Sequence, residues 1–217
     1  MSPKSFLLSD ALHSYLLASS TPIDEVLRSL ADETVRLGDV SGMQVAPEQG
    51  LLLTLLTRAI GARRAVEVGT FTGYSALCIA RGLADGGRLL CCDVSEEWTD
   101  IGRRHWEAAG VADRIDLVIG PAAETLAGLA DEPVDLCFVD ADKEGYATYW
   151  DLLVPRVRPG GLLLVDNVLW AGRVLDPGQH EPDTVAIRDF NEKVATDDRV
   201  QVVLLPIADG LTLAVKS

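Results

Sequence analysis

The stretch RAVEVGTFTGYSALCIARGLADGGRLLCCD, residues 64–93, holds two short apolar runs with a helical segment between them. The runs, 64–69 and 87–93, are almost continuously apolar, as strands covered on both faces must be. The segment 73–83 between them predicts a helix. Parallel sheets are built from strand, crossover helix and strand, so this stretch predicts an α/β fold.

The same alternation continues along the chain. Apolar runs follow at 115–120, 134–140 and 161–167, and helical segments at 96–109, 121–129, 145–156 and 183–196. A long loop separates the last of these runs from the last helix. Five strands separated by helices predict a parallel sheet with helices on both of its faces.

The carboxyl end of the chain has a different pattern. VQVVLLPIADGLTLAVK, residues 200–216, contains two apolar runs joined by a short turn at Ala208-Asp209-Gly210. Only antiparallel strands can be joined so tightly. We therefore expect one reversed strand at the carboxyl end of the sheet.

The amino-terminal residues predict helices rather than strands. Residues 5–18 and 22–37 are amphipathic, and the second segment has Thr21 as its expected cap and Pro22 at its first helical position. Residues 39–46 predict a loop. A third helix is expected from Pro47 to near Gly61.

A chain of 217 residues without repeats or linkers predicts a single domain. Within it, residues 1–46 supply the amino-terminal helices and a loop over the site, and residues 47–217 supply the catalytic core.

Charge and cysteine content narrow the function classes. The formal net charge is −14, with 19 basic and 33 acidic residues. Such a surface repels nucleic acid phosphates and anionic lipids, so neither is an expected partner. The amino terminus is too polar for a signal peptide, and no apolar run reaches the ~20 residues of a membrane helix. Each of the four cysteines lies in an apolar run, which favours buried thiols and a cytoplasmic protein: Cys78, Cys91, Cys92 and Cys137.

Acidic residues gather at the ends of the expected strands. Four of the five parallel strands end in an acidic residue, and the third ends in glycine: Glu67, Asp93, Gly120, Asp140 and Asp166, the last followed by Asn167. Ligands of open parallel sheets bind beyond the carboxyl ends of the strands. Aspartate is common in turns, so one or two of these residues are expected by chance, but four indicate a site.

The first turn and the end of the second strand predict a nucleoside site. Gly69 and Gly73 permit a tight turn and a close approach of the backbone to a ligand. Asp93 is placed to hold both hydroxyls of a ribose. The spacing is GxxxG, so the GxGxxG fingerprint for a diphosphate is absent. S-adenosylmethionine is a nucleoside without a diphosphate, and its cationic groups suit an acidic pocket.

A second group of residues predicts a metal site. Asp140, Asp166 and Asn167 follow consecutive strands and offer only oxygen ligands, which Mg²⁺ prefers. A helix cap at Asp140 and a simple turn at 166–167 are the alternative. Lys143 lies three residues after Asp140 in a chain with four lysines. It could act there as a general base or a charge stabiliser, against the default of a surface lysine.

These residues belong to a recognisable combination: EVGTFTGYSAL, CDVSEEW, GPAAETL, FVDADKEGYATYW and VDNVLWAGRV. From about Met43 to the carboxyl end, the chain resembles the cation-dependent O-methyltransferases of the caffeoyl-coenzyme A and catechol type, and is most similar to their small bacterial members. The resemblance implies a Rossmann-like class I methyltransferase fold. That fold has a seven-stranded, mostly parallel sheet with a reversed last strand and helices on both faces.

The resemblance also implies roles. The acceptor would be a small aromatic diol of the catechol type, the methyl donor S-adenosylmethionine, and the ion Mg²⁺ or another divalent cation such as Mn²⁺ or Ca²⁺. Lys143 would be catalytic, and Asp140, Asp166 and Asn167 would bind the metal. The cofactor would meet Val45, Glu67, Gly69, Thr70, Ser75 (with the methionine carboxylate), Asp93 (ribose), Ala122 (adenine), Asp140 and Tyr149. A homodimer is expected, with the first helices as a possible interface.

Substrate contacts and acceptor identity are less defined. Met43, Trp170 and Arg173 are expected near the acceptor, with loop packing as the alternative for Trp170. Simple catechols, caffeic acid, its coenzyme A ester, flavonoids and a hydroxylated bacterial natural product all stay open. The other tryptophans are expected to pack and the histidines to have no catalytic role: Trp98, Trp106 and Trp150; His13, His105 and His180.

Two other classes of protein stay open at this point. A nucleotide-dependent oxidoreductase could use a similar sheet, although GxGxxG is missing. A nucleoside-binding protein without catalytic activity could keep the pocket, although the set of Asp140, Lys143, Asp166 and Asn167 is complete.

Overall fold

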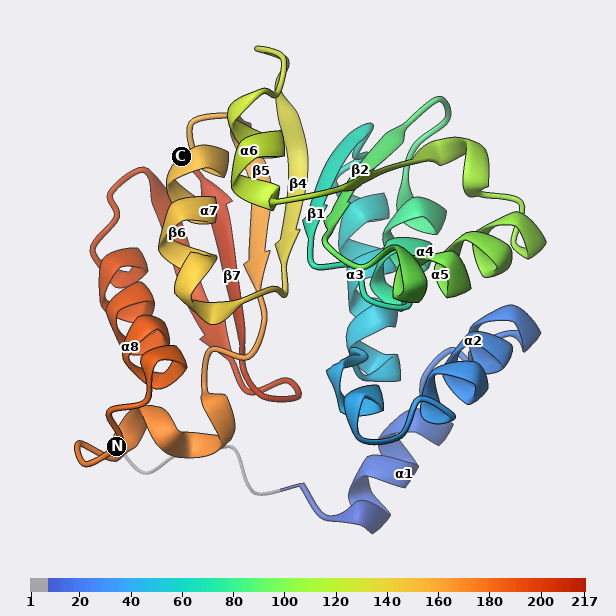
Figure 1. Ribbon diagram of the computed structural model, residues 1–217, viewed down its shortest axis with the longest axis horizontal. Helices are drawn as coiled ribbons and strands as arrows, with labels where there is room; N and C mark the ends of the chain where they lie inside the picture. The colour runs from blue at the N-terminus through green and yellow to red at the C-terminus, as the bar shows by residue number, and fades with distance from the viewer. Residues whose placement is uncertain (1–7) are drawn as a thin grey trace.

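The computed structural model describes residues 8–217 and contains one seven-stranded sheet in the order β3-β2-β1-β4-β5-β7-β6 (Figure 1). The strands are β1 (Arg64–Val68), β2 (Arg88–Asp93), β3 (Ile115–Ile119), β4 (Val134–Val139), β5 (Val157–Val165), β6 (Val200–Leu205) and β7 (Leu211–Lys216). Neighbouring strands among β1 to β5 pair in parallel, whereas β7 is antiparallel to both β5 and β6. The α/β fold with a reversed last strand is therefore confirmed.

Helices cover both faces of the sheet, as the alternating pattern predicts. The α-helices are α1 (Asp10–Ala18), α2 (Glu25–Val35), α3 (Pro47–Ala59), α4 (Tyr74–Gly82), α5 (Glu96–Ala108), α6 (Ala122–Ala127), α7 (Tyr146–Leu153) and α8 (Pro182–Ala195). Four 3-10 helices join them: η1 (Gly38–Met43), η2 (Ala112–Arg114), η3 (Lys143–Gly145) and η4 (Trp170–Leu175). Figure 1 shows α3, α4 and α5 on one side of the sheet and α6, α7 and α8 on the other.

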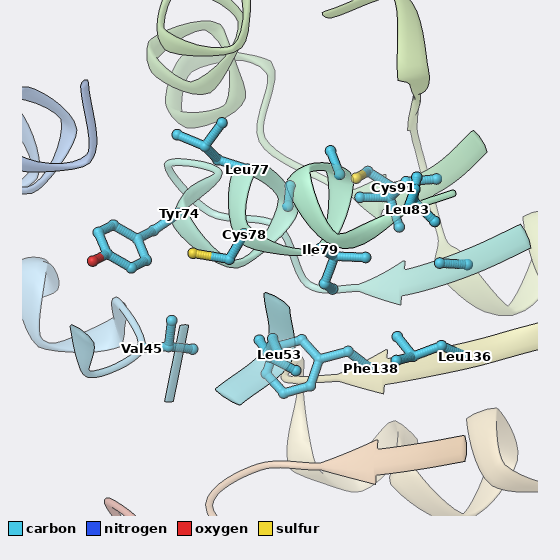
Figure 2. Close-up of a cluster of buried hydrophobic side chains, with 14 of the residues drawn as sticks. Val45, Leu53, Tyr74, Leu77, Cys78, Ile79, Leu83, Cys91, Leu136 and Phe138 are labelled. Carbon is cyan, nitrogen blue, oxygen red and sulfur yellow. The ribbon is translucent and has the colours of Figure 1, made fainter. Parts of the chain in front are cut away.

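The core consists of two apolar layers, one on each face. In the first layer, Leu53 of α3, Ile79 of α4 and Phe138 of β4 belong to one cluster of fully buried side chains (Figure 2). In the second layer, Trp150 of α7 meets Phe190 of α8 edge-on, with ring centroids 5.7 Å apart. Burial on both faces explains why the strand sequences are continuously apolar rather than alternating.

Several boundaries differ from the sequence prediction. Helix α2 begins at Glu25 rather than Pro22, because the Asp24 carboxylate caps it by accepting from the Leu27 amide at 3.0 Å. The expected loop at 39–46 contains η1, and β5 begins four residues early, across Gly160-Gly161. Residues 5–7 of the first predicted helix lie outside the described residues.

The cysteines and His105 are placed as expected. All four thiols are buried and free. His105 of α5 is buried, with Nδ1 2.9 Å from the Ile101 carbonyl and Nε2 3.2 Å from Ser29 Oγ of α2, so it packs two helices together. Among residues 8–217, no helix is both long and apolar enough to cross a membrane.

Candidate active site

A cavity of about 1040 Å³ lies at the carboxyl ends of the parallel strands, where the strand order reverses between β1 and β4. Every predicted metal ligand and catalytic residue lines this cavity, as do most of the predicted cofactor and substrate residues. The predicted residues on its wall are Met43, Val45, Gly69, Thr70, Ser75, Asp93, Ala122, Asp140, Lys143, Tyr149, Asp166, Asn167 and Trp170. Two predicted residues, Glu67 and Arg173, are not among the residues of the wall.

The turn after β1 brings two strand ends into contact. Gly69 has φ +86, and a Cβ atom at this position would lie 1.9 Å from the Asp140 carbonyl oxygen of the loop after β4. Only glycine tolerates both the left-handed backbone and this approach. Gly69 therefore allows the turn after β1, which is expected to bind the cofactor, to lie directly against Asp140, a predicted metal ligand.

Asp93 shapes the same turn. Its Oδ2 accepts from the amides of Thr70 at 2.8 Å and Phe71 at 2.7 Å, and its Oδ1 accepts from the Ser95 amide at 2.8 Å. A carboxylate oxygen can accept more than one hydrogen bond, so Asp93 can hold the turn and still bind a ribose hydroxyl.

Trp98 lies on the cavity wall, which differs from the expectation that it only packs. Its ring meets Phe71 edge-on, with centroids 5.1 Å apart, and both residues line the cavity. The sequence pattern placed Trp98 on α5, but it did not show that α5 starts at the rim of the site.

Glu67 lies in the strand beneath the cavity and is fully buried. Its Oε2 accepts from the Cys91 thiol at 3.4 Å, while Oε1 has no hydrogen-bond partner among the described residues. Burial raises the pKa of Glu67 to about 7, although the nearby Ser75 and Thr70 hydroxyls and the Cys91 thiol act to lower it. Of these three neighbours, the Cys91 thiol is the one whose contact with Glu67 has the geometry of a hydrogen bond. Thr70 Oγ1 has no hydrogen-bond partner among the described residues.

This shift predicts a pH-dependent stability that Glu67→Gln should remove. A pKa raised from 4.5 to about 7 means that the folded state prefers the protonated acid. The free energy of unfolding is therefore highest below the pKa of Glu67 in the unfolded chain. It falls by about 3 kcal/mol in total as the pH rises through the pKa of Glu67 in the folded protein. In urea unfolding without ligands, the free energy of unfolding of Glu67→Gln relative to the wild type should rise by that amount between pH 4 and pH 8.

Exposed Glu97 provides the control for this measurement. The Glu97→Gln variant should keep a constant difference from the wild type across the same pH range, because its carboxylate is solvated in both states. Parallel stability curves for Glu67→Gln and the wild type would contradict the assignment of a raised pKa to Glu67.

Lys143 lies at the centre of the acidic end of the cavity. Its Nζ lies 3.2 Å from Asp140 Oδ1, 2.7 Å from Asn167 Oδ1 and 2.7 Å from the Tyr146 hydroxyl, and the side chain is 10% exposed. The Tyr146 hydroxyl in turn donates to the Asp166 carbonyl at 2.9 Å. These three acceptors match the three N–H groups that a lysine ammonium can donate.

Asp166 completes this end of the cavity. Its Oδ1 accepts from the Asn167 amide at 2.7 Å, and its Oδ2 accepts from Nε2 of Gln49, on α3, at 2.7 Å. Asn167 has φ +57, a left-handed conformation that asparagine adopts more readily than most residues. This conformation accompanies the turn of the chain at the end of β5, where Asn167 Oδ1 meets Lys143.

The electrostatics of this end favour a cation. Burial, and after it the charge of Asp140, raises the pKa of Asp166 above its ordinary value. Burial also raises the pKa of Asp140, against the lowering effect of the Lys143 ammonium. Two carboxylates that repel each other in a buried site are stabilised by a divalent ion, which favours their ionised forms.

The donor set fits a hard divalent ion. Asp140, Asp166 and Asn167 all line the cavity, and the oxygens of Asp140 and Asn167 lie close enough together to share the Lys143 nitrogen as a donor. Two carboxylates and one amide oxygen are few ligands, as Mg²⁺ sites commonly have. Within residues 8–217, no group of three or more histidine, cysteine, aspartate or glutamate side chains is placed to hold a metal.

The chain matches the family model described as O-methyltransferase over residues 18–217. It is 39% identical over 212 residues to the probable caffeoyl-CoA O-methyltransferase 2 of Dictyostelium discoideum, covering 95% of this chain and 92% of that one. It is 41% identical over 210 residues to the mouse catechol O-methyltransferase domain-containing protein 1, covering 94% of this chain and 79% of that one. The chain belongs to the O-methyltransferase family.

Two solved structures place this O-methyltransferase among enzymes that bind the expected methyl donor. The O-methyltransferase of Bacillus cereus, solved with S-adenosylhomocysteine, superposes with a TM-score of 0.88 at 33% identity, over 95% of this chain and 97% of that one. TomG of Streptomyces achromogenes, involved in tomaymycin synthesis and solved with S-adenosylmethionine, gives 0.87 at 31% identity, over 95% and 96%. The chain is therefore an S-adenosylmethionine-dependent methyltransferase and not an oxidoreductase.

The loop after β5 of this methyltransferase closes one side of the cavity. Trp170 and Ala171 have φ of +48 and +50, and the Ala171 amide donates to Asp209 Oδ1 at 2.6 Å. The turn between β6 and β7 thereby holds the loop. The Trp170 ring lines the cavity, with its centroid 5.6 Å from Lys143 Nζ, whereas the Arg173 guanidinium lies 5.7 Å from the same ring, off the wall.

Sequence reasoning missed Tyr146 and Gln49. Tyr146 carried a detectable signal, because it lies three residues after Lys143, a spacing at which helical side chains meet. Gln49 carried no such signal, since its partner Asp166 lies 117 residues away along the chain.

Proposed function

We propose that this methyltransferase transfers a methyl group to one hydroxyl of a catechol-type aromatic substrate, with Mg²⁺ at Asp140, Asp166 and Asn167. The observation that carries the proposal is the meeting of Asp140 and Asn167 oxygens at Lys143 Nζ, beside Asp166, in the cavity that also contains Asp93 and the Gly69 turn. The relatives named for caffeoyl-CoA and catechol methylation support the same class of acceptor.

The donor end of the cavity binds and orients the cofactor. Asp93 would hold the ribose, and Ser75, at the start of α4, would bind the methionine carboxylate. Ala122 at the start of α6 would meet the adenine, and Val45 and Tyr149 would close over the cofactor. Tyr149 is fixed for this by donating its hydroxyl to Asp142 Oδ1 at 2.6 Å.

The acceptor end orients the diol. Met43 and Trp170 would pack against the ring of the substrate, and Arg173 beyond Trp170 could meet an anionic tail. A divalent ion at the three oxygen ligands would supply Lewis-acid activation, which favours the ionised form of a phenol that otherwise titrates near pH ~10.

Lys143 handles the charge of the reacting oxygen. As an ammonium it would stabilise a phenolate by a charged hydrogen bond, and after losing one proton it would accept the proton of the hydroxyl. The acceptor oxygen then attacks the methyl carbon, the O–C bond forms as the C–S bond breaks, and S-adenosylhomocysteine leaves. Alignment of the two bound reactants can supply roughly 7–11 kcal/mol.

The test is a panel of aromatic acceptors with S-adenosylmethionine, read by product mass and regioisomer. A vicinal diol such as 3,4-dihydroxybenzaldehyde should be methylated once, and 4-hydroxybenzaldehyde should not. Excess EDTA should lower turnover of the diol by roughly 100-fold or more, and added Mg²⁺ should restore it. Full activity in EDTA would contradict metal dependence, and equal turnover of the monophenol would contradict the diol requirement.

We further propose a cytoplasmic homodimer. The four free buried thiols suit a reducing compartment such as the cytoplasm. Tyr15 of α1 and Val35 of α2 are 68% and 67% exposed, and these residues would supply apolar surface to a dimer interface. Sedimentation velocity at micromolar concentration tests the dimer, and a single species of the 23.3 kDa chain would contradict it.

A further inference from the structure

Gln49 connects the amino-terminal part of the chain to the acidic end of the cavity. Its side chain is fully buried in the first turn of α3, lines the cavity, and donates from Nε2 to Asp166 Oδ2 at 2.7 Å. The carboxylate of Asp166 only accepts from an amide, so the nitrogen of Gln49 must face it.

The backbone of α3 holds Gln49 firmly against this carboxylate. The next residue, Gly50, packs on α4 so closely that a Cβ atom would lie 2.7 Å from the Tyr74 ring and 2.9 Å from Cys78 Sγ. The backbone of α3 therefore packs directly on α4 next to Gln49, which limits movement of this residue toward α4.

Burial of Gln49 is costly for the fold alone. Its Oε1 has no hydrogen-bond partner among residues 8–217, and a buried amide oxygen without a partner destabilises a protein. An apolar side chain of similar length at this position would avoid that cost. The hydrogen bond that Gln49 does make is to Asp166, so orientation of this carboxylate is the property that requires an amide here.

The two hydrogen bonds of Asp166 together fix its carboxylate plane. The Asn167 amide holds Oδ1 and Gln49 holds Oδ2, from opposite parts of the chain. Without Gln49, rotation about the Cβ–Cγ bond would be restrained at one oxygen only. Groups that hydrogen-bond metal-binding carboxylates commonly orient them, and their loss typically lowers metal affinity 10- to 100-fold.

We propose that Gln49 is a positioning residue that orients Asp166 and thereby sets the affinity of the site for a divalent ion. This inference rests on the proposed function, because it requires Asp166 to bind the metal. It adds to the proposed metal site a residue that does not itself bind the ion and that lies on α3, before the first strand of the sheet.

Gln49→Met tests the inference, since methionine keeps the length and volume of glutamine but cannot donate. Calorimetric titration of the full chain with MgCl₂ and MnCl₂, in saturating S-adenosylhomocysteine, should show affinity lowered about 10- to 100-fold. The affinity for S-adenosylhomocysteine should change less than 3-fold. Turnover should recover toward the wild-type value at high Mg²⁺, so that the KM for the metal changes more than kcat.

Thr54→Val is the matched control on the same helix. Thr54 Oγ1 donates to the Cys78 carbonyl at 2.8 Å, so the variant also loses a hydrogen bond of α3, whereas the two hydrogen bonds of the Asp166 carboxylate are left intact. Thermal unfolding should show both variants folded, and Thr54→Val should bind metal like the wild type. Equal or tighter metal affinity in Gln49→Met would overturn the inference, as would an equal loss in both variants. A wild-type protein that binds neither ion would instead overturn the proposed metal dependence itself.

Discussion

Asp140→Ala is expected to lower the rate of methyl transfer to a catechol by at least about 1000-fold. The change removes one of two carboxylates at the proposed metal site and one of the three partners of Lys143 Nζ. A bound divalent ion contributes several kcal/mol of charge stabilisation in the transition state, which corresponds to a factor of this size. Steady-state rates with a vicinal diol and S-adenosylmethionine provide the measurement.

Asp135→Ala is the matched control, because Asp135 lies near the opposite end of the same strand, β4. Its carboxylate accepts from the Arg63 and Arg64 amides and from the Arg158 guanidinium, so its loss should lower stability and leave turnover near the wild-type value. Binding of S-adenosylmethionine to Asp140→Ala, measured by calorimetry, separates a lost metal from a lost cofactor site. Turnover of Asp140→Ala within a few-fold of the wild type would remove this residue from the mechanism.

Much of the fold follows from local pattern. Continuous apolar runs predicted strands buried on both faces, and the tight Ala208-Asp209-Gly210 turn predicted the reversed strand β7. Parallel strands all end at the same edge, so the placement of Asp93, Asp140 and Asp166 in one cavity followed from topology alone. These inferences need only the hydrophobic pattern of the sequence and the rule that crossover connections between parallel strands are right-handed.

The remaining details depend on contacts between distant segments. The sequence predicted Thr21 as the cap of α2, but the cap is Asp24, which also pairs with Arg81 of α4 at 2.6 Å. The hydrogen bond of Gln49 to Asp166 likewise joins two residues that are 117 positions apart in the sequence. Sequence periodicity contains no information on such pairs, because it describes each segment by itself.

The position of Glu67 shows a different limit of strand-end reasoning. Glu67 lies inside β1, one residue before its end, and its carboxylate is fully buried beneath the cavity, whereas Gly69 lies beyond the strand end and on the cavity wall. The pattern identified the acidic residue but not how deeply it is buried. Its fully buried carboxylate and its unpaired Oε1 are therefore properties that the structure adds.

Lys143→Met is expected to lower kcat by roughly 100- to 10 000-fold, the range for loss of a positioned proton-transfer group. Lys143 Nζ lies between Asp140, Asn167 and the Tyr146 hydroxyl, at the acceptor end and near Trp170. The Kd for S-adenosylmethionine should stay within about 3-fold, because Lys143 is not among the proposed cofactor contacts. Single-turnover rates with preloaded cofactor would isolate the methyl-transfer step.

Lys143→Arg distinguishes the two possible roles of the lysine. Arginine keeps a positive charge but cannot lose a proton at accessible pH, so it can stabilise a phenolate but cannot act as a general base. If charge is what matters, Lys143→Arg should retain much more activity than Lys143→Met, whereas equal losses would assign proton transfer. Lys193→Met, which removes a surface ion pair with Asp151, is the control and should turn over like the wild type. A wild-type kcat in Lys143→Met would exclude both roles and leave the three oxygen ligands to activate the acceptor alone.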